Sequence, residues 1–92
     1  MFIMNSKEFI INGKLYSTED SLLLCQSTDA YFGEIAVYHT EKGAFFSVRT
    51  PFAEKTEVKV IDRQTALKIL DDNPTGIINE NYIKAFGKVE MG

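Results

Sequence analysis

The sequence predicts an α+β domain, in which an antiparallel β-meander comes first and two C-terminal helices pack on one face of it. Two observations carry this prediction. Apolar and polar residues alternate across Glu34–Thr50, as in a β-hairpin. After Asp62, apolar residues recur at helical spacing. The 92 residues suffice for a single domain, predicted to span 1–92, and are too few for two independent cores.

The N-terminal region carries the strongest short hairpin signal in the chain. Glu8–Ile11 and Lys14–Tyr16 are short runs rich in apolar residues, and Asn12-Gly13 joins them. A type I′ turn requires two residues with positive φ, which Asn-Gly supplies at low cost. We therefore expect a small hairpin here.

The stretch Ser17–Cys25 has two interpretations. Ser17 is a good helix cap, and Glu19-Asp20 would place acids in the first turn of a helix of about two turns. The run Leu22–Cys25 is also compatible with an extended strand, because short apolar runs do not distinguish the two. We predict primarily a helix for this stretch, and a strand is the alternative.

Two strands, 33–40 and 44–50, are predicted to flank a turn at Glu41-Lys42-Gly43. Glu57–Ile61 follows as a third strand, with Val58 and Val60 facing inward. The hairpin residues predicted to face inward are Ile35, Val37, Phe46 and Val48. Those predicted to face outward are Tyr38, Phe45 and Arg49.

Two helices are predicted after the strands. Asp62 caps the first, which runs to about Asp71 and buries a stripe of Ala66, Leu67 and Leu70. Asn79 is expected to cap the second helix and Gly87 to end it. Its core-facing residues are predicted to be Tyr82, Ile83 and Phe86.

Composition excludes several classes of function. The formal net charge is −3, from 13 acidic and 10 basic residues, which argues against direct nucleic-acid binding. The single cysteine forms no disulfide within the chain. No segment approaches the roughly 20 apolar residues of a membrane span. We therefore expect no membrane association and a cytoplasmic location.

The sequence offers no constellation for catalysis. His39 is the only histidine and Cys25 the only thiol, and their spacing gives no support for a catalytic pair. A structural zinc site needs about four Cys or His ligands, which the chain lacks. We predict no catalytic, metal or cofactor site and a protein that is not an enzyme.

Two kinds of binding surface are suggested instead. Lys42-Gly43-Ala44-Phe45-Phe46 has a limited likeness to an RNA-recognition signature, although Ala44 and Phe45 break its order. Aromatic residues and Arg are enriched in protein interfaces. The candidate protein-binding residues are Tyr31, Phe32, Tyr38, Phe45, Arg49 and Phe52. The alternative, that the helices cover these rings as core, is equally weighted.

The chain also resembles a family of small uncharacterised proteins of phages and mobile elements. The matching segments are Tyr16–Glu19, Val37–Thr40, Glu41–Phe46 and Tyr82–Glu90. Family members commonly carry a tryptophan after the first element and a glycine-rich stretch before the third strand, and this chain lacks both. The resemblance implies a bacterial host and a binding role, such as inhibition of a defence complex of the anti-CRISPR type.

The leading functional hypothesis is therefore a non-enzymatic interaction protein that binds a host protein or ribonucleoprotein complex. The first alternative is a nucleic-acid-binding regulator that uses the hairpin around Lys42, Phe45 and Arg49. The second is a small nuclease-like enzyme that uses His39. A homodimer is a further possibility, because a short meander leaves sheet edges that can pair across a two-fold axis.

Overall fold

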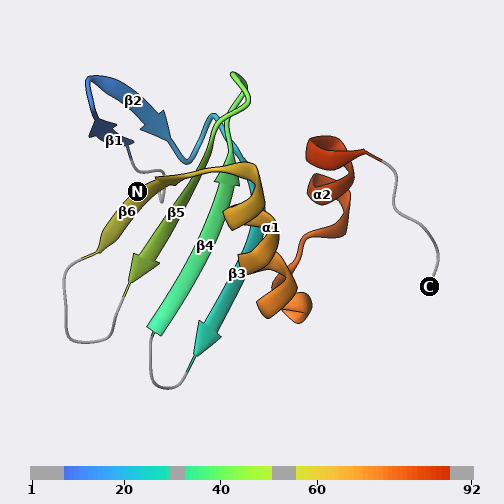
Figure 1. Cartoon of the computed structure of the whole chain (residues 1–92). Helices are drawn as coiled ribbons and strands as arrows, with labels where there is room; N and C mark the ends of the chain where they lie inside the picture. The colour runs from blue at the N-terminus through green and yellow to red at the C-terminus, as the bar shows by residue number, and fades with distance from the viewer. Residues whose placement is uncertain (1–7, 30–32, 51–55, 88–92) are drawn as a thin grey trace, which may run out of the picture.

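The computed structural model describes residues 8–29, 33–50 and 56–87, which form antiparallel sheets followed by two α-helices, the α+β arrangement predicted. In Figure 1, α1 lies across the main sheet and a small hairpin lies at its upper left. The elements are β1 (Glu8–Ile11), β2 (Lys14–Ser17), β3 (Leu22–Asp29), β4 (Gly33–His39), β5 (Phe45–Thr50), β6 (Glu57–Ile61), α1 (Arg63–Asp72), a 3-10 turn η1 (Pro74–Gly76) and α2 (Asn79–Phe86).

Strands β1 and β2 form the predicted N-terminal hairpin. Asn12 and Gly13 have φ angles of 53° and 77°, the positive values that a type I′ turn requires. Phe9 pairs with Tyr16 and Ile10 with Leu15, so each pair lies on one face of the ribbon. The prediction of this hairpin and its turn is confirmed.

The main sheet has four antiparallel strands in the order β3-β4-β5-β6. The turn between β4 and β5 sets the register of these two strands, because the backbone N–H of Thr40 donates to the carbonyl of Ala44 at 2.8 Å. Gly43, with φ 90°, allows the tight return of the chain. As a result Tyr38 lies opposite Phe46, and His39 lies opposite Phe45.

The predicted division of this hairpin into one inward and one outward face is wrong. Phe46 and Val48 lie on the face opposite to Val37, because Val37 pairs with Ser47. Phe45, predicted to point outward, is buried on the same face as Val37. Alternation gives the two faces of each strand, whereas the relation between strands depends on the register that the turn imposes.

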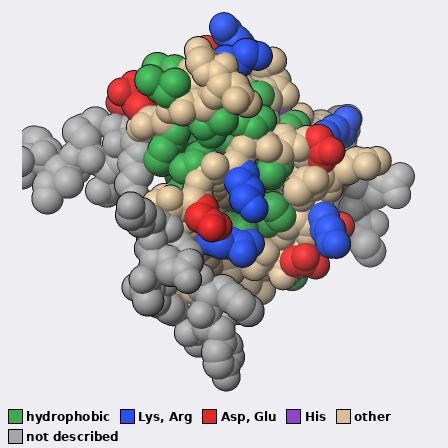
Figure 2. Space-filling view, turned by 60° about the vertical axis from the view of Figure 1, so that its left-hand side comes forward, with side chains coloured by type: hydrophobic (Ala, Val, Ile, Leu, Met, Phe, Trp, Pro, Cys, Tyr) green, Lys and Arg blue, Asp and Glu red, His purple; other side chains and the backbone are tan. Residues whose placement is uncertain are grey.

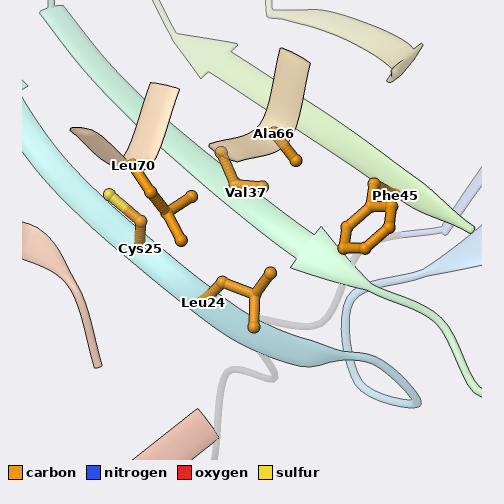
Figure 3. Packing of buried hydrophobic residues seen from close by; sticks show 6 residues of the cluster. All are labelled: Leu24, Cys25, Val37, Phe45, Ala66 and Leu70. Carbon is orange, nitrogen blue, oxygen red and sulfur yellow. The ribbon is translucent and has the colours of Figure 1, made fainter. Parts of the chain in front are cut away.

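The helices cover one face of the main sheet, as predicted. Phe45 and Val37 from the strands meet Ala66 and Leu70 of α1, and all four are buried. Figure 3 shows these side chains pointing toward one another, together with Leu24 and Cys25 of β3. The second helix extends this cluster with a ring of Phe86 stacked on Phe45, with ring centroids 5.5 Å apart.

The opposite face of the sheet is covered by the β1–β2 hairpin. Tyr16 meets the ring of Phe46 edge-on, with centroids 5.6 Å apart, and Val48 is buried beside them. The partly buried residues packed against this second cluster are Phe9, Ile11, Tyr38, Ala44 and Val58. The sheet is therefore packed between two layers rather than against one.

The segment predicted primarily as a helix, Ser17–Cys25, instead leads into strand β3. Ser17 accepts a hydrogen bond from the Asp20 N–H at 3.4 Å, which caps a turn and not a helix. The following residues pair with β4, and a β-bulge between Leu23 and Cys25 shifts the register. Sheet pairing along β4 therefore outweighs the helix propensity of the leucines.

The outer edge of β3 is covered by the segment between the two helices and by the first turn of α2. The backbone N–H of Ile78 donates to the carbonyl of Leu24 at 2.9 Å, and the side-chain amide of Asn81 donates to the carbonyl of Leu23 at 2.9 Å. Gly76 lies so close that a Cβ there would be 2.4 Å from the carbonyl oxygen of Gln26. The close approach of this backbone to that of β3 therefore requires glycine at this position.

The helix caps follow the predictions in part. Asp62 caps α1, with its Oδ1 accepting from the Thr65 N–H at 2.7 Å, and this hydrogen bond lowers the pKa of the carboxyl. Asn79 is the first residue of α2 and not its cap, which is Ile78 and has no side-chain hydrogen bond. Two residues predicted to face inward are instead exposed: Ile83 at 45% and Val60 at 43%.

We predict that Gly76→Ala destabilises the protein by about 1–3 kcal/mol, because the added methyl group forces the 3-10 turn away from β3. Urea titration monitored by circular dichroism measures the free energy of unfolding. Thr75→Ala is the matched control, since Thr75 is exposed in the same turn. Equal stability of the two variants would contradict the close contact with Gln26.

We predict that Phe45→Ala lowers the free energy of unfolding by about 3–5 kcal/mol, the range for removing a buried aromatic ring. The control is Ile83→Ala, which removes a partly exposed side chain and is expected to cost less than about 1 kcal/mol. The same titration compares the two variants. A small loss at Phe45 would mean that its ring faces solvent after all.

Candidate functional site

The six residues predicted to bind protein do not form one surface within the described structure. Tyr31, Phe32 and Phe52 lie outside the described residues. Tyr38 is half-buried toward the β1–β2 hairpin, whereas Phe45 is buried toward the helices. Of the three predicted residues that the structure describes, only Arg49 is exposed.

Tyr38 belongs to the packing between the sheet and the hairpin. Its ring stacks on Phe46 with centroids 5.0 Å apart and an interplanar angle of 13°. Burial, and next the negative charge of Glu34, raises the pKa of Tyr38 above its usual value. The phenol thus remains neutral at physiological pH and presents only part of its ring to solvent.

Arg49 borders an open cleft of about 380 Å³ between the sheet and the end of α1. The cleft lies where β4 begins and β5 ends, and it mixes one guanidinium with two carboxylates. Its lining residues are Gly33, Glu34, Ile35, Arg49, Ile69, Asp72 and Asn73. Among its described lining residues there is no histidine, cysteine or hydroxyl side chain, so these residues supply no thiol or hydroxyl nucleophile and no imidazole base.

Cys25 and His39 are each held by other contacts. The Cys25 thiol is buried beside the backbone carbonyl of Asn73 at 3.9 Å, and burial raises the pKa of this thiol. The His39 ring packs on Phe45 with centroids 4.5 Å apart, and its Nδ1 is buried without a hydrogen-bond partner among the described residues. A buried thiol with a raised pKa is a poor nucleophile.

The described residues also contain no group of three or more His, Cys, Asp or Glu side chains arranged to hold a metal ion. Within the same ranges, no helix is long and apolar enough to cross a membrane.

The likeness to an RNA-recognition signature does not extend to its rings. Such a signature works by presenting strand aromatics on which bases stack. Phe45 lies under the helices and Phe46 lies under the β1–β2 hairpin, and both are buried. Neither ring therefore offers a face on which a base could stack.

The two most exposed large hydrophobic residues in the described ranges lie on the outer face of the β1–β2 hairpin. Ile10 and Leu15 are direct cross-strand partners and are 77% and 61% exposed. Glu8 and Ser17 form the next pair on this face. We name these four residues the hairpin patch. Figure 2 shows hydrophobic side chains gathered in the upper half of the molecule, with charged side chains around and below them.

The hairpin patch was missed at the sequence level although it has a visible signal. Phe9, Ile10 and Ile11 are three consecutive apolar residues in a strand, so both faces of β1 carry apolar side chains. The inner face is occupied by Phe9 and Ile11, which pack on the sheet. A strand that covers one side of a sheet leaves its other apolar face to solvent, and this asymmetry identifies the patch.

Comparison of the chain with protein-family models, with curated proteins and with solved structures gave no match. The resemblance to small phage and mobile-element proteins stays a prediction. The candidate site is accordingly argued from the geometry of this chain alone.

Proposed function

We propose that the protein is a non-enzymatic binding protein that docks to a protein partner through the hairpin patch. The observation that carries this proposal is the exposed cross-strand pair of Ile10 and Leu15. Single exposed apolar residues are common on protein surfaces, whereas contiguous exposed apolar patches mark interaction sites. Covering the exposed part of each side chain would contribute at most about 1.5–3 kcal/mol to binding, the range for full burial.

The chemistry of the patch favours a protein over a nucleic acid. Ile10 and Leu15 are aliphatic and offer no ring on which a base could stack. The nearest charged residue on the same face is Glu8, which would repel phosphate. The net charge of −3 acts in the same direction. An apolar pair with one acidic neighbour fits a partner with an apolar depression and a basic rim.

The class of partner that we propose is a protein or ribonucleoprotein complex of a bacterial host, in particular a defence complex such as CRISPR-Cas. Support for this class is the sequence resemblance to small phage and mobile-element proteins. Such inhibitors act by occupying a surface that the host complex needs, a role for which an exposed patch and no catalytic group suffice.

The experiment that tests this proposal places a photocrosslinking amino acid at position 15 or, as the matched control, at position 83. Leu15 and Ile83 are both large exposed apolar residues, but Ile83 lies on α2, away from the hairpin patch. The probe is a panel of purified bacterial defence complexes of the CRISPR-Cas type. We expect a crosslink from position 15 to one of these complexes and none from position 83.

Substitutions quantify the same contact. We expect Leu15→Ser to weaken binding to the crosslinked complex by at least about tenfold, which corresponds to one buried apolar side chain, and Ile83→Ser to leave it unchanged. Both variants are expected to melt near the wild-type temperature, because both side chains are exposed. Crosslinking from position 83 alone, or equal effects of both substitutions, would contradict the assignment to the hairpin patch.

A further inference from the structure

Among the residues that the structure describes, one edge of the main sheet is covered and the other is open. The outer side of β3 is bonded to the segment after η1 through Ile78 and Asn81. Strand β6 ends the strand order on the other side, and it pairs only with β5 within the described ranges. Figure 1 shows β6 at the left border of the sheet. An exposed edge of this kind is a template for pairing with another strand.

The register determines which backbone groups β6 presents outward. In an antiparallel pair, opposed residues alternate between bonded and non-bonded pairs. The bond from Thr40 to Ala44 makes Tyr38–Phe46 a bonded pair of β4 and β5, so Ser47 bonds to Lys59 on the other side. The backbone groups of the neighbouring β6 residues, Val58 and Val60, consequently point away from the sheet.

The side chains of this edge are complementary to themselves. We propose that a second copy of the chain pairs with β6 antiparallel, around a two-fold axis through Val58. This register places Glu57 opposite the partner's Lys59 and Lys59 opposite the partner's Glu57. It also joins Val58 to the partner's Val58 through their outward-pointing backbone groups. Two ion pairs and an apolar contact then lie along one continuous sheet.

Other two-fold registers of the same edge are worse. An axis through Lys59 would set two lysines directly opposite each other, which is destabilising. An axis through Val60 would leave little strand to pair, because β6 ends at Ile61 and Asp62 caps α1. The axis through Val58 uses Thr56 to Val60 on both copies and places opposite charges against each other.

The dimer has a consequence for the arrangement of surfaces. A two-fold axis perpendicular to a sheet keeps equivalent faces on the same side. Both pairs of helices would lie on one side and both β1–β2 hairpins on the other, so two hairpin patches would face the same direction. The interface is small, so we expect a weak dimer whose population rises with concentration.

Charge exchange tests the dimer and its register. In the dimer, Lys59→Glu places the carboxylate of Glu57 opposite the new carboxylate of the partner. Glu57→Lys places the new ammonium group opposite that of the partner's Lys59. We expect each single variant to weaken the dimer by about tenfold, and the double variant with both changes to restore it. Lys42→Glu is the matched control, since it makes the same charge change as Lys59→Glu on an exposed turn. Analytical ultracentrifugation over a concentration series measures the dissociation constants.

Amide hydrogen exchange gives an independent readout. The amides of Val58 and Val60 should become protected as concentration rises, whereas the Lys59 amide, bonded within the sheet, should not change. Thermal melts separate any loss of folding from loss of association. A protein that stays monomeric at millimolar concentration would overturn the proposal. A dimer that the double variant fails to restore would also overturn it, and neither result bears on partner binding at the hairpin patch.

Discussion

The register of β4 against β5 is the constraint on which the rest of the structure depends. The five residues from Thr40 to Ala44 close the hairpin, and this closure puts the ring of Phe45 on the face of Val37 and the ring of Phe46 on the face of Tyr38. Both rings are large and apolar, so neither face can be left to water. The sheet therefore requires a cover on each side, and the chain supplies the two helices for Phe45 and the β1–β2 hairpin for Phe46.

Covering both faces of the sheet leaves an apolar surface of the β1–β2 hairpin exposed to solvent. A two-stranded hairpin has an inner and an outer face, and only the inner one reaches the sheet. Phe9 and Tyr16 are used inward, which leaves Ile10 and Leu15 in solvent. The hairpin that covers the sheet is apolar on both of its faces, so its outer apolar pair is left exposed. An aliphatic residue at both outer positions is unnecessary for the fold, which is why these two residues carry the proposed function.

The two edges of the main sheet differ in how far the described parts of the chain cover them, and packing explains this difference. The chain returns past β3 between α1 and α2, and the glycine at position 76 allows its backbone to approach that strand closely. Strand β6 receives no such cover in the described ranges and carries alternating charge in Glu57 and Lys59. A lysine at an exposed edge discourages indiscriminate pairing, while an acid two residues away admits one self-complementary register.

Local signals in the sequence determined much of this protein. Asn12-Gly13 determined the first turn, Asp62 the start of α1, and the alternation in β4 and β5 their strand character. These features depend on residues close in sequence, whose conformational preferences act without the rest of the fold. The absence of a histidine or cysteine cluster was likewise a matter of composition.

Only the tertiary structure decided the remainder. The leucines before Cys25 became a strand because β4 was available to pair with them, and Phe45 became core because the register turned it toward the helices. The hairpin patch depends on which face of β1 meets the sheet, and the open edge of β6 depends on where the chain after α1 returns. Contacts between distant segments set each of these outcomes, and no local preference of the residues encodes them.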